Sequence, residues 1–213
     1  TETSMLYEAP LPIATTQTVK VKAFREGWTP STTVTRTYTM IYGALDAPTI
    51  APAAGTYATD QSISLQGPAG ATLRYTTNGS TPTTSSTLYT APFQVSASTT
   101  VKARAFHPDW TASATTTAVY TLVVATPTLS LPTGSYAPGQ AVTIACETPG
   151  ATLRYTLNGT TPTPTSPTWT TGAALPLADV TVTVGAWKTG YTASAVATSS
   201  YTLTEAFTPG AVA

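Results

Sequence analysis

The chain repeats itself, and the length of the repeat limits its fold more than any other feature. The segment ATLRYTTNGSTPT at residues 71–83 returns as ATLRYTLNGTTPT at residues 151–163. Upstream of each copy, GTYATDQSISL at 55–65 corresponds to GSYAPGQAVTI at 134–144. Equivalent positions lie about 80 residues apart, which is the length of a small domain. We therefore predict a row of small, similar domains.

A third copy is present at the N-terminus, but only as its second half. VKVKAFREGWTPS at residues 19–31 matches VKARAFHPDWTAS at 101–113, and YTM at 38–40 matches the closing YTL at 120–122. Because half a sandwich cannot bury its apolar faces, we expect further strands to complete this domain. They can come from more chain upstream or from a neighbouring subunit of an assembly, and the sequence leaves both origins open.

These matches give the expected domain boundaries. We predict the C-terminal half of an immunoglobulin-like repeat at residues 1–42, complete repeats at 43–122 and 123–204, and a C-terminal tail at 205–213. The expected linkers, residues 41–47 and 123–126, are short, so we expect an extended rod rather than freely moving domains.

Within a repeat, apolar and polar residues alternate as they do in β-strands. In VKARAF at residues 101–106, the small apolar residues alternate with two cationic ones, which is the period of a half-buried strand. Thr is the most frequent residue, and 18 Pro and 14 Gly supply turns. This composition favours strands over helices. The predicted fold is all-β: tandem immunoglobulin-like antiparallel β-sandwiches, two complete and one half.

Each complete repeat carries an Asn-Gly turn followed by a proline. The predicted structural turns consist of Asn78, Gly79 and Pro82, and of Asn158, Gly159 and Pro162. Asn-Gly commonly closes a hairpin, but a nearby Pro cannot donate to a sheet, so we expect a loop that crosses to the other sheet. Asn78 and Asn158 also begin N-x-[ST] sequons, which makes them candidate glycosylation sites.

The order of GTY, GATLRYTTNGSTPT, LYTAP, TVKARAF and a final Tyr resembles the chitobiase/β-hexosaminidase C-terminal-like domain, a fibronectin-III-associated immunoglobulin-like fold. The resemblance covers both complete copies and the half copy. This chain has Asn78 and Asn158 where the family usually has Asp, and its last copy departs from the pattern at residues 172–179. The resemblance implies a non-catalytic accessory or spacer module of secreted and surface bacterial proteins, found beside glycoside hydrolase or adhesive domains.

The charges argue against several classes of partner. Nine Lys and Arg balance nine Asp and Glu, and only 8% of residues are charged. A chain without a basic surface is not expected to bind nucleic acid or an anionic membrane. The longest apolar run, about residues 122–125, is too short to span a membrane.

The residues that catalysis and metal binding need are scarce. His107 is the single histidine and is expected in a turn, and Cys146 is the single cysteine and is expected to be a buried free thiol. The acidic residues are scattered, and a glycosidase pair would require loops that bring Asp60 and Asp109 together. We therefore predict no enzyme activity, no catalytic or metal-binding residues and no cofactor.

Aromatic residues are the one candidate binding feature. Trp28, Trp110 and Tyr191 occupy one equivalent position just after a turn, and Trp169 occupies another. These four are candidate carbohydrate-stacking residues, and packing over the rim of the sandwich is the alternative. The other repeated tyrosines are expected in the core: Tyr57 and Tyr136, Tyr75 and Tyr155, and Tyr38, Tyr120 and Tyr201.

Two functions remain open from the sequence. The first is an extracellular structural or spacer protein of immunoglobulin-like beads, such as a subunit of a filament or surface appendage. Its partners would be copies of itself or neighbouring domains of a longer chain, and zero net charge favours such association. The second is a carbohydrate-binding accessory region of a secreted glycoside hydrolase or adhesin, with a polysaccharide as partner. Both place the chain outside the cell or on its surface.

Overall fold

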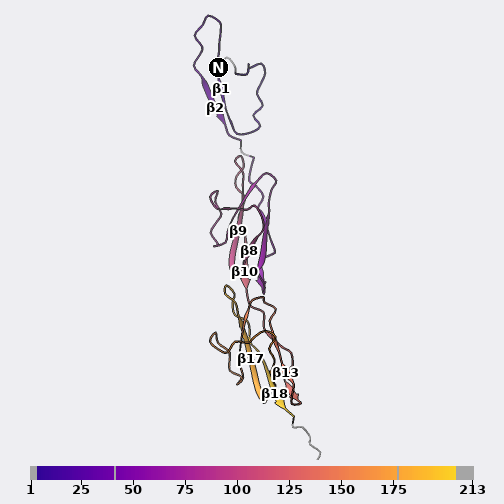
Figure 1. The fold of residues 1–213 in the computed structure, drawn as a ribbon. Helices are drawn as coiled ribbons and strands as arrows, with labels where there is room; N and C mark the ends of the chain where they lie inside the picture. Colours follow the sequence, from indigo (N-terminus) through magenta and orange to yellow (C-terminus); the bar gives the residue numbers. More distant parts are fainter. Residues whose placement is uncertain (1–3, 41, 177, 205–213) are drawn as a thin grey trace, which may run out of the picture.

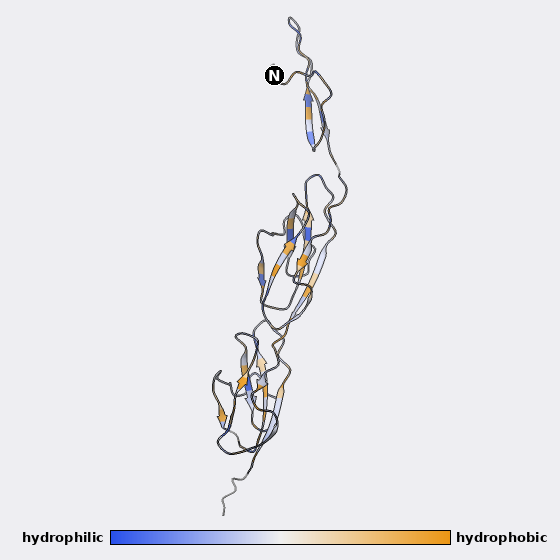
Figure 2. Ribbon diagram, turned by 90° about the vertical axis from the view of Figure 1, so that its right-hand side faces the viewer, coloured by the Kyte–Doolittle hydropathy of each residue, from blue (hydrophilic) through white to orange (hydrophobic). Residues whose placement is uncertain are grey.

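The computed structural model describes residues 4–40, 42–176 and 178–204, which form three lobes in a row (Figure 1). The row is also elongated when turned by 90° (Figure 2), with the N-terminal segment at one end. The described residues contain strands and no helix. The predicted all-β fold of tandem immunoglobulin-like sandwiches is thereby confirmed, whereas the tail predicted at 205–213 lies outside the described residues.

The second repeat (residues 43–122) is a sandwich of two sheets. One sheet has the order β3 (Thr49–Ala51), β5 (Gln61–Gln66), β8 (Phe93–Val95), and the other has the order β4 (Gly55–Tyr57), β10 (Thr116–Leu122), β9 (Thr99–Phe106), β6 (Thr72–Thr76), β7 (Thr87–Leu88). Neighbouring strands are antiparallel, except that β4 pairs with β10 in parallel. Ile63 of β5 and Val101 of β9 are both fully buried in one cluster, so the two sheets share a core.

The third repeat (residues 123–204) has the same plan. Its larger sheet has the order β12 (Gly134–Tyr136), β18 (Ala197–Leu203), β17 (Val180–Trp187), β15 (Thr152–Thr156), and its other strands pair as β11 (Thr128–Leu129) with β14 (Ile144–Ala145) and β13 (Ala141–Val142) with β16 (Leu175–Pro176). The equivalent of β5 is split at Thr143, whose N–H donates to the Ser130 hydroxyl (2.9 Å). In the segment that departs from the family pattern, β16 has two residues, against three in β8.

The alternation read from the sequence places the core residues. In β9, Val101, Ala103 and Ala105 are fully buried, whereas Lys102 and Arg104 are half-buried on the other face. The closing tyrosines are buried as well, and their hydroxyls donate to backbone carbonyls: Tyr120 to Pro52 (2.7 Å) and Tyr201 to Leu131 (2.8 Å). A buried phenol keeps a hydrogen-bond partner in this way, which avoids the cost of an unpaired donor.

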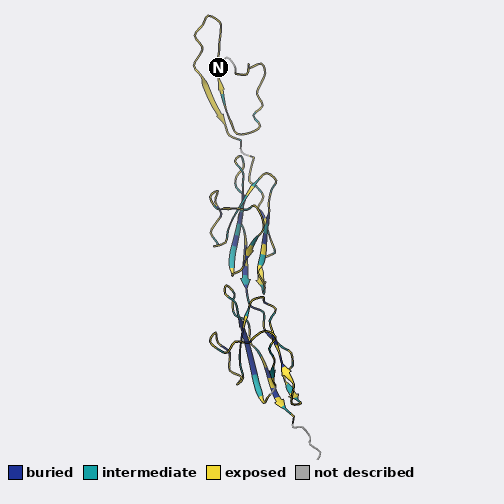
Figure 3. Ribbon diagram, in the orientation of Figure 1, coloured by how far each residue is buried: buried dark blue, intermediate teal, exposed yellow. Residues whose placement is uncertain are grey.

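The N-terminal hairpin consists of β1 (Gln17–Val21) and β2 (Val34–Tyr38). Its register matches that of the complete repeats, because Gln17 faces Tyr38 as Thr99 faces Tyr120 and Val180 faces Tyr201. Its surroundings differ: in Figure 3 both strands are mostly exposed, and Val21 and Tyr38 are 53% and 45% exposed. The prediction that Tyr38 lies in the core is therefore wrong for this chain, because no second sheet covers the hairpin within the described residues.

The connection after each Asn-Gly turn was predicted to change sheets, and this is wrong. In the second repeat the chain returns as β7, which pairs with β6 in the same sheet, and changes sheets only at β8. In the third repeat Thr168 returns to form a bridge with Arg154 of β15, and the chain changes sheets only at β16. Gly79 and Gly159 have φ of 77° and 75°, a region that glycine enters without strain. Pro82 and Pro162 are buried. Each proline is therefore buried within a connection that first returns to the same sheet.

Candidate functional site

Three turns closed by the same backbone hydrogen bond contain the repeated aromatic residues, and we call them the first, second and third aromatic turns (residues 25–28, 107–110 and 188–191). In each, the N–H of the last residue donates to the carbonyl of the first, over 3.1 Å from Trp28 to Arg25, 3.3 Å from Trp110 to His107 and 3.1 Å from Tyr191 to Lys188. The first and third turns have glycine at their third position, whereas the second has Asp109. The three turns therefore share their closing hydrogen bond, and the second differs from the other two in backbone angle and in side chains.

The third aromatic turn binds the second repeat through an ion pair. Lys188 Nζ lies 3.0 Å from Asp60 Oδ1, and the Tyr191 hydroxyl donates to the same oxygen. Lys188 also lies 4.3 Å from the centre of the Tyr191 ring. The hydrogen bonds from Tyr191 and Lys188 lower the pKa of Asp60, and the bond to Asp60 raises the pKa of Lys188. The loop between β4 and β5 is thus fixed to the third repeat.

Backbone groups close the same junction. The Ser98 N–H donates to the Gly190 carbonyl (3.1 Å), the Thr192 N–H donates to Leu122 (2.8 Å), and the Thr192 carbonyl accepts from Val124 (2.9 Å). Gly190 has φ of 83°, and a Cβ added there would lie 2.7 Å from the Ser96 carbonyl oxygen. Only glycine meets both demands, the backbone angle and the close approach.

Tyr191 contributes to the cores on both sides of this junction. It packs against the buried cluster of the second repeat, which contains Leu122, and against that of the third, which contains Val124. The Thr148 hydroxyl adds a further link, because it donates to the Ala58 carbonyl of the second repeat (2.8 Å). The junction therefore combines charge, backbone hydrogen bonds and apolar contact.

The second aromatic turn contacts a linker instead of a loop. The rings of Tyr42 and Trp110 stack with centres 5.5 Å apart and planes at 23°. The Thr111 N–H donates to the Gly43 carbonyl (2.8 Å), and the Tyr42 hydroxyl donates to the Ala14 carbonyl of the N-terminal segment. The side chain of Trp110 therefore lies partly against a linker that is longer than the one before the third repeat.

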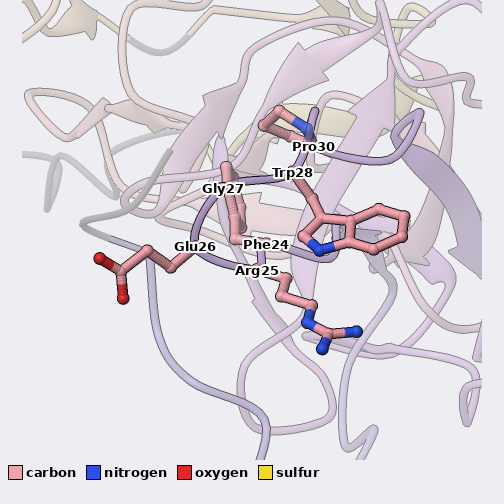
Figure 4. Close-up of a pocket in the computed structure, with 6 residues that line it drawn as sticks. All are labelled: Phe24, Arg25, Glu26, Gly27, Trp28 and Pro30. Atoms are coloured by element: carbon pink, nitrogen blue, oxygen red, sulfur yellow. The ribbon is translucent and has the colours of Figure 1, made fainter.

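Within the described residues, the first aromatic turn has no such neighbour. Trp28 is 67% exposed, and the Arg25 guanidinium carbon lies 5.2 Å from the centre of its ring. Figure 4 shows both side chains extending to the same side of the turn, with Glu26 directed away from them. They help to line a surface pocket together with Phe24, Gly27 and Pro30. A Cβ added at Gly27 would meet no atom of the described residues within 4 Å.

Trp169, the fourth candidate for carbohydrate stacking, lies in the core of the third repeat. It is 7% exposed, and its ring meets that of Tyr155 edge to face at 5.6 Å. Its indole N–H has no hydrogen-bond partner among the described residues. A ring this buried offers no face to a sugar, which leaves Trp28 and, in part, Trp110 as accessible rings.

The sequon asparagines are exposed and form Asx turns. Asn78 Oδ1 accepts from the Ser80 N–H (3.0 Å) and hydroxyl (2.7 Å). Asn158 Oδ1 accepts from the Thr160 N–H (3.2 Å) and hydroxyl (2.6 Å). These bonds give both asparagines a role in the turn, and their glycosylation stays a prediction.

The acidic and thiol groups are not gathered into a reactive site in the described residues. Asp60 lies at the junction with the third repeat, whereas the Asp109 carbonyl accepts from Tyr42 at the junction with the N-terminal segment (3.2 Å), so the two are not a pair. Cys146 is half-buried rather than buried, and its thiol donates to the Ala125 carbonyl (3.3 Å). No group of three or more His, Cys, Asp or Glu in the described ranges is placed to hold a metal ion. Among these residues no helix is long and apolar enough to cross a membrane.

Sequence reasoning missed the partnership of Asp60 with Lys188. The only signal for it was a difference between repeats: Asp60 aligns with Gly139, and Lys188 aligns with His107 and Arg25. The cores of the repeats are alike, so a charged residue that is present in one repeat and absent from another points to a contact between repeats rather than within one.

Solved structures similar to this chain include a chimeric titin Z1Z2 functionalized with a peptide from decorin, immunoglobulin domains 1–5 of Sidekick-1, and fibronectin(III)-like modules of Clostridium thermocellum CbhA. The titin chimera is 12% identical with a TM-score of 0.27, covering 76% of this chain and 99% of that one. The Sidekick-1 domains are 12% identical with a TM-score of 0.33, covering 88% of this chain and 45% of that one. The CbhA modules are 15% identical with a TM-score of 0.24, covering 73% of this chain and 93% of that one.

A search among curated proteins found no match. The chitobiase/beta-hexosaminidase C-terminal domain family matches at residues 52–129 and 131–198, which together exceed half of the chain. The two matched segments correspond to the two complete sandwiches described above. The chain therefore belongs to the chitobiase/beta-hexosaminidase C-terminal domain family.

Proposed function

We propose that this chain is a non-catalytic extracellular spacer, built of immunoglobulin-like repeats that are held end to end in a fixed orientation. The observation that carries the proposal is the junction between the second and third repeats. Domains within a chain usually move relative to one another unless their interface restrains them. Here the ion pair of Asp60 with Lys188 and the backbone bonds of Thr192 act on both sides of a short linker.

The exposed N-terminal hairpin supports an extension of this proposal. Val21 and Tyr38 are exposed, although their equivalents Ala103 and Tyr120 are fully buried. In a spacer, the first half of another repeat covers this face, either from upstream chain or from a neighbouring subunit of a filament or surface appendage. The shared register of all three hairpins means that such a half-repeat finds the same edge to pair with.

The test measures the distance between the repeats in solution. Nitroxide labels are placed at Val119→Cys and Ser200→Cys, which are equivalent exposed positions on β10 and β18, in a Cys146→Ser background. Pulsed electron paramagnetic resonance is expected to give one narrow distance distribution. A broad distribution, like that of two independently tumbling domains, would contradict the spacer function.

A second candidate function is supported by Trp28. Its indole is 67% exposed beside a cationic side chain, which suits stacking on a sugar ring of a polysaccharide in a carbohydrate-binding accessory region. Co-sedimentation with insoluble chitin and cellulose tests it. Binding that is lost in Trp28→Ala and kept in Trp110→Ala, whose ring already stacks on Tyr42, would favour this function. Absence of binding by the unmodified chain would reject it for these polymers.

A further inference from the structure

We propose that the first aromatic turn is a docking site for the acidic β4–β5 loop of a preceding repeat of the same family, which inserts a carboxylate beside Arg25 and Trp28. This inference rests on the proposed spacer function and names the partner that binds at the N-terminal hairpin. The partner is defined by its chemistry: an immunoglobulin-like repeat with Asp or Glu at the position of Asp60, joined through a short linker.

The first and third aromatic turns are alike where the second differs. Both read cation, any residue, glycine, aromatic: Arg25-Glu26-Gly27-Trp28 and Lys188-Thr189-Gly190-Tyr191. In both, the cation lies over the aromatic ring, at 5.2 Å and 4.3 Å from its centre. The second turn, His107-Pro108-Asp109-Trp110, has neither the cation nor the glycine.

The third turn shows what this pattern binds. Asp60 of the preceding repeat accepts from both Lys188 and Tyr191, and the bare Gly190 leaves room for Ser96 and Ala97 of the same repeat. Gly27 also has a positive φ, 74°, but no atom in the described part of the chain lies within 4 Å of a Cβ added there. The first turn thus presents a cationic donor and open space like those that the third turn uses to bind Asp60 and to approach Ser96.

Arg25 and Trp28 are suited to the same carboxylate. A guanidinium presents paired N–H donors to a carboxylate, and the indole N–H of Trp28 takes the place of the Tyr191 hydroxyl as the second donor. Glu26 is directed away from these two side chains (Figure 4), so it leaves the site cationic. The third repeat of a second copy lacks the needed acid, because Gly139 stands at the position of Asp60. This difference favours a repeat with an acidic loop over simple head-to-tail joining of identical chains.

The first experiment moves the first turn into the third position of the full chain. Lys188→Arg, Thr189→Glu and Tyr191→Trp give the sequence of residues 25–28 at the junction, with Gly190 unchanged, and the labels at positions 119 and 200 report on it. The distance distribution is expected to stay narrow and to broaden when Asp60→Asn is added. A broad distribution with Asp60 in place would overturn the proposal.

The matched control moves the second turn instead. Lys188→His, Thr189→Pro, Gly190→Asp and Tyr191→Trp remove the cation and place a side chain against Ser96, so the distribution is expected to broaden. If the distance distribution stays as narrow as with the transplanted first turn, the sequence of the turn does not determine whether the β4–β5 loop binds, and the proposal fails.

The second experiment supplies the missing partner. Residues 43–162 of the chain are fused ahead of Thr1, which corresponds to Thr163 in the repeat, so that a second copy of Asp60 precedes a completed first repeat. Hydroxyl-radical labelling of Trp28, read by peptide mass spectrometry, is expected to fall several-fold and to rise again in Arg25→Gln. Labelling that stays at the level of the unextended chain, while the amides of β1 and β2 become protected from hydrogen exchange, would overturn this inference and leave the spacer function intact. If those amides stay unprotected, completion of the hairpin has failed instead, and the transplanted turn decides the inference.

Discussion

Tyr38 and Tyr120 occupy the same position of two repeats in opposite surroundings, so one substitution made at each measures how far the N-terminal hairpin lacks a core. Tyr120 is fully buried, packs beside Tyr57 with ring centres 6.1 Å apart, and donates to the Pro52 carbonyl. Tyr38 is 45% exposed. The two residues face their partner strands in the same register, so the backbone context is matched.

The expected costs follow from burial. Removing a buried aromatic side chain costs about 3–5 kcal/mol, because the transfer energy is lost and a cavity remains. Tyr120→Ala should therefore destabilise the second repeat by that amount. Full burial of a large apolar side chain contributes about 1.5–3 kcal/mol, and Tyr38 is only partly covered, so Tyr38→Ala should cost about 1 kcal/mol or less.

Pulsed hydrogen exchange in increasing urea, read by peptide mass spectrometry, reports on each repeat separately. With a urea dependence of about 2 kcal/mol per molar, Tyr120→Ala should lower the midpoint of the β9–β10 peptides by about 1.5–2.5 M. Tyr38→Ala should move the midpoint of the β1–β2 peptides by less than about 0.5 M. Equal shifts for the two variants at low protein concentration would refute the reasoning, because they would mean that the hairpin is already covered.

Three further predictions concern single positions. Gly190→Ala should broaden the distance distribution between the labelled repeats, because the added Cβ meets Ser96. Gly150→Ala should leave it narrow, since Gly150 has φ of 73° and no described atom within 4 Å of an added Cβ. Both variants should lower the free energy of unfolding by about 1–2 kcal/mol, because alanine is strained in the left-handed region. Acidification should loosen the same junction, because the pKa of Asp60 is lower in the folded chain than in the unfolded one. The stability that the Asp60 carboxylate contributes to the junction is fully present above about pH 4 and is lost as the pH falls through the folded pKa. This pH-dependent broadening of the distance distribution should be absent in Asp60→Asn. Cys146, whose thiol is half-buried, should react with a thiol reagent such as DTNB more slowly than a cysteine placed at the exposed Val119, and equal rates would contradict the described packing.

The cores of the complete repeats were predictable because alternation in a strand is a local signal. Val101, Ala103 and Ala105 are spaced by two residues, and that spacing alone places them on one face. The two copies of the repeat also predicted similar domains, and their hairpins do share one register. The exposure of Tyr38 was not predictable in this way, because whether this side chain is covered depends on strands that the hairpin does not itself contain.

The junctions were beyond local reasoning. Asp60 and Lys188 are 128 residues apart in sequence, and nothing in either segment specifies the other. The parallel pairing of β4 with β10 and the return of β7 to the sheet of β6 are likewise long-range choices, which alternation and turn residues do not determine. Trp169 and Trp28 show the same limit, since both are aromatic residues near strand ends, yet one is 7% and the other 67% exposed.

The most direct test of the spacer function is electron microscopy, together with intact mass spectrometry, of the protein isolated from the organism that makes it. We predict straight rods or fibres of beads with constant spacing, in which the β1–β2 hairpin lies inside a closed sandwich. Beads that adopt variable angles to one another, or single chains whose first hairpin remains uncovered, would contradict it.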